Sequence, residues 1–325
     1  MSLRHLLTLF SLSLFFGLGQ SITVHADAYP SRPITLVVPY EAGQTSDVAA
    51  RLFAKGLEAI IKQPILIENR PGAGGNTGTE AVARATPDGY TLVWGTNATH
   101  AANAALYSSI RYNPVEDFTP LVRTYNVPIF LVASNNFGVK NLAEVVAKAK
   151  VSPGEHTVAV ASTSSQVALQ LLQDATGVSF KKVPYRGATS AIQGLMAGEV
   201  DLLLETAGAL QAGLAAGQFT PIGVTSSSRV AFMPEIPSLG EQGATGFEIR
   251  GWNAMFAPKG TPPEIVKLLY EASIEVVTSP DYTSRIIAMG GEPPVPSTPE
   301  ELDLFVRNEV AAWGDLIRRI GLKAD

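Results

Sequence analysis

Short apolar runs rich in β-branched residues alternate with amphipathic stretches from Pro33 onward. Such runs are typical of buried strands, whereas the apolar residues of the longer stretches recur at helical spacing. The alternation predicts the β-α-β order of an open parallel sheet. In the first part of the chain we expect strands at 34–38, 64–67 and 91–94 and helices at 47–61 and 76–85.

The same alternation resumes after residue 128 and predicts a second α/β unit. Two units also agree with the chain length of 325 residues, because single cores stop growing near ~250 to 300 residues. In this second series we expect strands at 129–133, 157–160, 180–183, 200–204 and 220–224 and helices at 142–150, 166–175 and 190–197.

The C-terminal part of the chain has helices but few strands. A strand is expected at 249–257, and the helices that follow have no strand partners nearby, so we expect them to return and cover the first unit. The chain would then cross between the units near 123–128 and again near 243–251, which would form a hinge. The helices expected here, each with a proline in its first turn, are 262–277, 280–289 and 299–320.

The expected fold class is therefore α/β with two lobes, each an open, mostly parallel sheet flanked by helices, joined by two crossing segments. One lobe would comprise residues 27–125 together with 248–325, and the other residues 126–247. Open α/β sheets bind ligands at the carboxyl ends of their strands. The segments that follow the strands are accordingly the first places to search for a site.

The N-terminus has the pattern of a secretory signal. Arg4 and His5 precede an apolar run at 6–18, and Val24-His25-Ala26 offers small residues at the spacing of a cleavage site. The alternative is a membrane anchor, but the run is only about 13 residues long, where a spanning helix needs roughly 20. We expect cleavage after Ala26 and a protein that works outside the cytoplasm, in a periplasm.

Composition narrows the function classes further. Acidic residues outnumber basic ones by 29 to 24, so the basic face that nucleic acid requires is not expected. The chain has no cysteine, which excludes disulfides, thiolate metal sites and a cysteine nucleophile. Glycines at 72, 74, 75 and 78 miss the register of a dinucleotide-binding turn by one residue. We therefore predict neither a metal nor a cofactor.

The first expected strand ends in a small polar turn that leads into a helix. Asp47 is placed to cap this helix, and the backbone N–H groups before it would face a cavity where the helix dipole favours an anion. We interpret Asp47 as a structural cap and the loop as functional. The candidate ligand-binding residues of this loop are Tyr40, Gln44, Thr45 and Ser46.

Hydroxyl-rich turns follow two further strands. Each can donate hydrogen bonds to carboxylate oxygens, and each can equally be a helix cap. Their recurrence at strand ends in both units favours a ligand site between the units. The candidates are Asn97, Thr99 and His100 in the first unit and Ser162, Thr163, Ser164 and Ser165 in the second.

Two more strand ends in the second unit carry polar and charged candidates. Tyr185 and Arg186 follow one strand, and Arg186 suits either a bidentate bond to a carboxylate or a surface salt bridge. Glu205, followed by Thr206, places a single acid where the cleft is expected. This acid would either pair with Arg186 or accept a hydrogen bond from a polar ligand group.

Catalysis finds little support in the sequence. After residue 26 the histidines are His100 and His156, and neither H-E-x-x-H nor G-x-S-x-G occurs. We predict no catalytic residue. A secreted enzyme that uses His100 with Glu205 is the remaining catalytic alternative.

Motifs spread over nearly the whole chain after residue 28 are specific in their order and spacing, although each is weak alone. They are Y-P-S-R-P-I (29–34), V-P-Y (38–40), E-N-R-P-G-A-G-G-N (68–76), P-D-G-Y-T-L (87–92), D-F-T-P (117–120), V-P-Y-R-G (183–187) and Trp252 followed by A-P-K-G-T-P (257–262). With these motifs the sequence resembles the Bug family, the extracytoplasmic solute-binding proteins of tripartite tricarboxylate transporters.

The resemblance implies two hinged α/β lobes that close on one small organic anion and deliver it to a membrane permease. It also implies that the loops 40–46 and 162–165 hold a ligand carboxylate, partly through water. The sequence departs from the family pattern at Gln44, where a glycine is common, and at Glu41, where a small neutral residue is common. Near the second-lobe candidates, Glu205 favours an ammonium group on the ligand and Arg186 a second carboxylate.

The leading hypothesis is a monomeric periplasmic binding protein for a small carboxylate, either an aliphatic dicarboxylate, an aromatic acid or an acidic amino acid. Its partners would be the permease subunits of a tripartite tricarboxylate transporter. The same fold would also serve a periplasmic sensor that signals carboxylate availability, because fold does not fix function.

Overall fold

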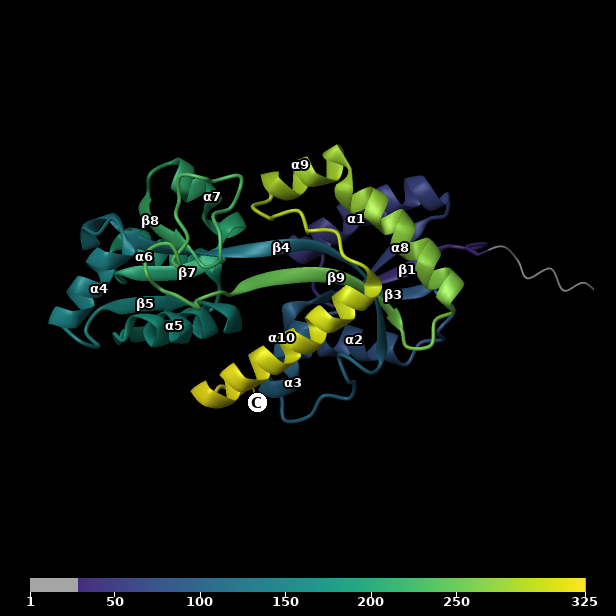
Figure 1. Cartoon of the computed structure of the whole chain (residues 1–325), viewed down its shortest axis with the longest axis horizontal. Helices are drawn as coiled ribbons and strands as arrows, with labels where there is room; N and C mark the ends of the chain where they lie inside the picture. Colours follow the sequence, from purple (N-terminus) through teal and green to yellow (C-terminus); the bar gives the residue numbers. More distant parts are fainter. Residues whose placement is uncertain (1–28, 325) are drawn as a thin grey trace, which may run out of the picture.

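The computed structural model describes residues 29–324 and shows an elongated molecule with two halves (Figure 1). These residues form a nine-stranded sheet in the order β2-β1-β3-β9-β4-β7-β5-β6, with β8 paired to β4. Two strands, β4 (Phe118–Ser134) and β9 (Arg250–Pro258), run between the halves. The predicted α/β class is confirmed. The predicted signal sequence, residues 1–26, lies outside the described residues.

The first half is built around β1 (Ile34–Val38), which pairs in parallel with β2 (Ile65–Asn69) and β3 (Thr91–Thr96). Successive residues of a strand point to opposite faces, and both faces of this sheet are covered. Leu36 belongs to the apolar cluster of one face and Val37 to that of the other. The helices of the first face are α1 (Thr45–Ile61), α8 (Pro263–Thr278) and α9 (Pro280–Ala288), and those of the second are α2 (Asn76–Ala83), α3 (Asn103–Leu106) and α10 (Pro299–Ile320).

The second half is built around β5 (Thr157–Val160), which pairs in parallel with β6 (Lys181–Pro184) and β7 (Leu202–Thr206). The end of β4 pairs antiparallel with β7 and with β8 (Phe219–Val224). Parallel pairing in each half is thus joined to antiparallel pairing at the centre, and the sheet is mixed. The helices of this half are α4 (Leu142–Val151), α5 (Thr163–Thr176), α6 (Ala188–Ala197) and α7 (Ala207–Ala215).

The strands β4 and β9 form the connection between the halves. Residues 118–128 of β4 pair antiparallel with β9, and the register shifts twice along this pairing. The segment predicted to make the first crossing, 123–128, lies inside β4, and the second, 243–251, leads into β9. The connection is therefore a pair of hydrogen-bonded strands and not two loose linkers.

Helix α10 begins with a capping box in which Thr298 and Glu301 each bond the backbone N–H of the other. It packs on the first half through Val306 and Trp313, which are buried there. Near its C-terminus, Arg319 forms an ion pair of 2.9 Å with Asp174 of α5. The helix therefore touches both halves (Figure 1). Across residues 29–324, none of the helices is both long and apolar enough to cross a membrane.

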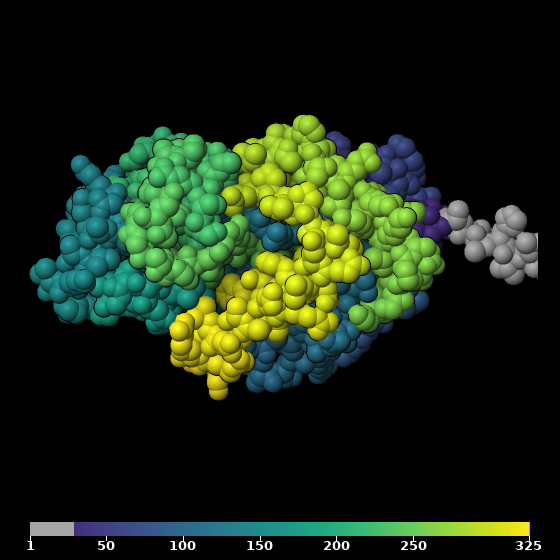
Figure 2. All heavy atoms as spheres, viewed as in Figure 1, coloured from purple at the N-terminus to yellow at the C-terminus, as the bar shows by residue number. Residues whose placement is uncertain are grey.

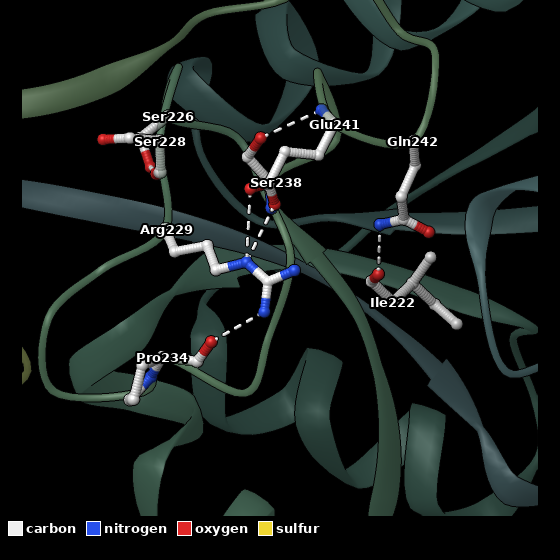
Figure 3. A network of polar contacts seen from close by, with 8 residues as sticks. All are labelled: Ile222, Ser226, Ser228, Arg229, Pro234, Ser238, Glu241 and Gln242. Carbon is white, nitrogen blue, oxygen red and sulfur yellow. Dashed lines mark hydrogen bonds and ion pairs between the residues drawn. The ribbon is translucent and has the colours of Figure 1, made fainter.

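The segment between β8 and β9 contains no helix or strand of its own, yet a polar network fixes it (Figure 3). The guanidinium of Arg229 donates to both carboxylate oxygens of Glu241, at 3.2 and 3.0 Å, and to the carbonyl oxygen of Pro234. The side chain of Gln242 donates to the carbonyl oxygen of Ile222 and accepts from the backbone N–H of Leu142. These bonds tie the segment to the second half before the chain returns along β9.

Candidate functional site

A cavity of about 210 Å³ lies at the junction of the two halves. The residues around it come from the carboxyl ends of β3, β5 and β7 and from the crossing strands, which is the edge where open α/β sheets bind ligands. We call it the ligand pocket. It is lined by Asn97, Val127, Ile129, Ser162, Ser164, Ser165, Leu204, Glu205, Thr206 and Gly251.

The N-terminus of α5 forms one wall of the ligand pocket. Ser162 is the N-cap of this helix and exchanges capping-box hydrogen bonds with Ser165. Ser164 takes no part in the cap, and its hydroxyl accepts a hydrogen bond of 3.5 Å from the side-chain amide of Asn97. Asn97 follows β3 in the first half, so this contact joins the two halves across the pocket. The side chains of Ser164 and Asn97 thus bond each other across the pocket and take no part in the helix cap.

The pocket is also lined by Glu205 at the end of β7, a residue that is 7% exposed. One of its carboxylate oxygens accepts the backbone N–H of Thr206 at 2.7 Å. Burial raises the pKa of the Glu205 carboxyl above its usual value. The hydrogen bonds from Thr206 lower the pKa, but their effect is smaller. None of the residues that line the pocket is lysine, arginine or histidine. The carboxylate therefore faces the cavity without a cation beside it.

The loop after β1 is ordered by Asp47. Gln44 occupies the N-cap position of α1 but its side chain makes no capping bond. The buried carboxylate of Asp47 instead accepts the backbone N–H of Gly43 at 2.8 Å, and it also accepts from Arg51 and Asn69. Asp47 is structural, as expected, but the prediction that it caps the helix is wrong, because Gln44 is the N-cap and Asp47 lies in the first turn of α1, where it holds the preceding loop. Glu41 and Gln44 are exposed, and neither lines the pocket.

The other candidates of this loop hold the loop and the sheet together. The hydroxyl of Tyr40 lies 2.7 Å from that of Thr96, and burial raises the pKa of Tyr40 to about 12. Ser46 donates to the side-chain carbonyl of Asn253 in β9 at 2.8 Å. Thr45 is exposed. None of these residues lines the ligand pocket, and their contact with a ligand stays a prediction.

Thr99 and His100 lie in a π-helical turn, Ala98–Ala102, and both are buried. The His100 ring stacks on Phe256 with 3.9 Å between ring centres, and its Nδ1 lies 2.9 Å from the hydroxyl of Thr99. Burial lowers the pKa of His100 to about 3, so the ring is neutral at physiological pH. Neither residue lines the pocket, and the structure places His100 in the core of the first half.

The remaining candidates lie outside the pocket. Tyr185 is half-buried and its hydroxyl lies 3.5 Å from Glu199, while Arg186 is exposed. Within the described chain, no ion pair joins Arg186 to Glu205. Thr163 is half-buried in the first turn of α5 and also lies outside the pocket. The pocket therefore brings together Asn97, Ser162, Ser164, Ser165, Glu205 and Thr206 of the predicted residues.

The pocket also contains four residues that the sequence analysis did not select. Val127 and Ile129 of β4 and Gly251 of β9 form the wall contributed by the crossing strands, and Leu204 precedes Glu205. At Gly251 a Cβ atom would lie 3.1 Å from the Cβ of Val127 and 3.3 Å from the Oδ1 of Asn97. The absence of a side chain there keeps space open. The predicted crossings were the signal that pointed toward these strands.

A family model described as the tripartite tricarboxylate transporter family receptor matches residues 49–322. The chain belongs to this family. The receptor is 34% identical over 308 residues to the protein BugT of Bordetella pertussis, a match that covers 94% of each chain. The resemblance expected from the sequence motifs is confirmed.

Solved structures agree with this assignment. R. palustris Rpa4515, solved with adipate, has a TM-score of 0.77 and 32% identity, and the match covers 91% of the receptor and 99% of that chain. MatC from Rhodopseudomonas palustris, with bound malate, has a TM-score of 0.73 and 33% identity, with coverage of 89% and 100%. The receptor thus has the two-lobe fold of these solute-binding proteins.

The receptor has a second, larger cavity of about 410 Å³ between α10 and the crossing strands, and the surface is hollowed between α10 and the second half (Figure 2). Arg250 and Gly251 are neighbours in β9, and Arg250 lines this cavity whereas Gly251 lines the ligand pocket. Arg123 lies over the ring of Phe305 in the second cavity, 4.6 Å from its centre. Leu171 of α5, in the second half of the molecule, also lines this second cavity.

Proposed function

We propose that this receptor captures a small organic carboxylate between its two lobes and delivers it to the permease of a tripartite tricarboxylate transporter. The observation that carries the proposal is the contact of Asn97 with Ser164, because it brings a donor from each half to one side of the ligand pocket. The carboxylate ligands of the related solved structures, adipate and malate, support the ligand class.

The carboxylate end of the ligand would bind at the N-terminus of α5. The first backbone N–H groups of a helix have no partner within the helix, and the helix dipole favours an anion there. The Ser164 hydroxyl and the Asn97 amide would add two donors from the two sides. The cavity volume of about 210 Å³ is below the ~300 to 1,000 Å³ of sites for drug-sized molecules, so a ligand of few carbon atoms is expected.

Ligand binding would drive closure of the two lobes. The lobes are proposed to comprise residues 27–125 with 248–325, and residues 126–247, with β4 and β9 as the hinge. A ligand that touches both lobes binds the closed state more tightly, and so raises its population. The closed state of a monomer would then present the surface that the permease recognises.

Export to the periplasm completes the proposal. The apolar run at 6–18 and the small residues before Ala26 support a signal peptide that is cleaved after Ala26. Related solved structures described as periplasmic, among them the binding protein BugD, support the compartment.

The test is binding to ligand-free protein, prepared by unfolding and refolding the purified receptor. Aliphatic dicarboxylates, aromatic acids and amino acids are added one at a time, and thermal unfolding is recorded. A ligand that binds only the folded state stabilises it by about 2.7 kcal/mol at a hundredfold excess over Kd. Stabilisation by one acid that is lost in Asn97→Ala supports the proposal. No stabilisation by any of these acids would reject it.

A further inference from the structure

Arg123 of β4 has fewer partners than a partly buried guanidinium requires. It lines the second cavity, and its Nε atom is buried without a hydrogen-bond acceptor. Within residues 29–324, none of its nitrogen atoms forms an ion pair or a hydrogen bond. The ring of Phe305, over which it lies, offers no oxygen acceptor. A buried cationic donor without an acceptor is costly, because it loses hydration and gains no bond in return.

Glu309 of α10 lines the same cavity but is bound elsewhere. Its Oε2 accepts the indole N–H groups of Trp252 at 2.7 Å and of Trp313 at 3.2 Å. In the described part of the chain, no ion pair joins this carboxylate to Arg123. Burial and the charge of Arg250 lower the pKa of Arg123, and the attraction of Glu309 opposes them with a smaller effect. The guanidinium of Arg123 is therefore short of negative charge.

Arg250, the other cation of this cavity, is already paired. Its guanidinium donates to Glu248 and lies 3.9 Å from a carboxylate oxygen of Glu292. Among the charged residues that line the cavity, all of which the structure describes, Arg123 alone has neither a hydrogen bond nor an ion pair. An anion that enters the cavity would find free donors at this residue.

Much of the remaining cavity wall is apolar. The volume of about 410 Å³ falls within the ~300 to 1,000 Å³ of sites for small organic molecules, which combine apolar walls with a few polar groups that fix orientation. The apolar lining residues are Leu171, Ile249, Phe305, Ala312, Trp313 and Leu316. The cavity thus suits an organic anion better than an inorganic one.

We propose that the second cavity binds an organic monocarboxylate with an apolar body. The carboxylate accepts hydrogen bonds from Arg123, whose planar guanidinium matches two carboxylate oxygens, and the body packs on the apolar wall. A second carboxylate on the ligand would be repelled by Glu309, so a monoanion is expected. The cavity and the ligand pocket share no lining residue, so this is a second site and not a part of the first. The inference does not depend on the proposed function.

The experiment compares acids with their neutral amides. Ligand-free receptor is titrated calorimetrically with benzoate against benzamide, phenylacetate against phenylacetamide and hexanoate against hexanamide. Acetate, which carries the charge without the apolar body, is titrated as well. In at least one pair the acid should bind about tenfold tighter, or more, than both its amide and acetate.

Substitution of Arg123 tests the role of its charge. Arg123→Met keeps an unbranched side chain without the cation and should weaken binding of the acid by about tenfold or more. Arg123→Lys keeps the charge but not the planar group, and it should retain part of the affinity. Arg111→Met removes the same charge from an exposed position of the first half and should change nothing. Thermal unfolding of each variant without ligand confirms that it folds.

A second set of variants tests the cavity without altering any charge, and it decides the matter if Arg123→Met does not fold. Ala312→Trp places a large side chain at the cavity wall and should weaken binding of the acid by about tenfold or more. Ala311→Trp adds the same side chain at the adjacent exposed position outside the cavity and should not. Asn97→Ala, which alters the ligand pocket, should also leave this binding unchanged.

Loss of binding in Asn97→Ala together with full affinity in Arg123→Met would place the acid in the ligand pocket. That result would overturn the inference while supporting the proposed function. Equal binding of every acid and its amide, or no binding of any of these acids, would also overturn the inference.

Discussion

Ser162 and Ser164, two residues apart at the start of α5, are expected to have different roles. The Ser162 hydroxyl accepts the backbone N–H of Ser165 at 3.1 Å and is part of the capping box. The Ser164 hydroxyl has one contact, the 3.5 Å hydrogen bond from Asn97. Ser162→Ala should therefore lower stability, whereas Ser164→Ala should lower ligand affinity.

The magnitudes follow from what each substitution removes. Loss of an N-cap side chain costs about 1 kcal/mol of folding free energy, so Ser162→Ala should shift the urea midpoint accordingly. Ser164→Ala removes no helix contact and should leave the free energy of unfolding within about 0.5 kcal/mol. Loss of one hydrogen bond to a charged ligand should weaken binding by about 1 to 2 kcal/mol, or about 5- to 30-fold in Kd.

Urea unfolding without ligand and calorimetric titration with the ligand found for the wild-type protein measure the two effects separately. Equal loss of stability in both variants would refute the division between cap and ligand contact. Unchanged affinity in Ser164→Ala would show that this hydroxyl does not contact the ligand. It would also contradict binding of the ligand carboxylate at the N-terminus of α5.

Three further outcomes are expected. Burial raises the pKa of Asp47, but its hydrogen bonds, that from Arg51 first among them, outweigh burial and hold the pKa below the usual value. The ionised carboxylate therefore stabilises the fold above about pH 4, and this stabilisation is lost as the pH falls from there through the lowered pKa. The free energy of unfolding of Asp47→Asn, measured in urea, should depend less on pH between these two values than that of the wild type. Gly251→Ala should weaken ligand binding in calorimetry without unfolding the protein, because its Cβ would crowd Val127 at the pocket wall. Arg186→Ala should leave Kd within about twofold, because the side chain is exposed and outside the pocket, and a large loss of affinity would show that it meets the ligand on closure.

Local patterns predicted most of the strands and helices, since hydrophobic periodicity and capping residues act within a few positions. The first part of β4 was not predicted, because Pro120, Pro128 and the polar Arg123 interrupt its alternation. In the structure the register with β9 shifts beside two of these positions, which lets the strand pass them. Helix α7 was also missed, because its sequence of alanine, glycine and leucine has little amphipathic pattern.

For the candidate site, too, local sequence patterns identified some residues, whereas the positions of others depend on tertiary packing. Strand ends identified Asn97, Ser164 and Glu205, because topology alone brings such positions to one edge of the sheet. The burial of His100 depends on its stacking against Phe256, about 150 residues further along the chain, which no local pattern reveals. Long-range packing decided which polar residues face the cavity and which serve the core.

Both cavities beside β9 are lined by residues of α5. Helix α5 reaches the ligand pocket at Ser164 and the second cavity at Leu171, and α10 holds its far end through the pair Arg319–Asp174. If the lobes rotate as proposed, a rotation that narrows one cavity would also change the other, because α5 lines both. Under the proposed closure, a substitution such as Ala312→Trp, which adds a large side chain to the wall of the second cavity, would change the free energy of closure. Ligand affinity would then depend also on residues of α10 that do not line the ligand pocket.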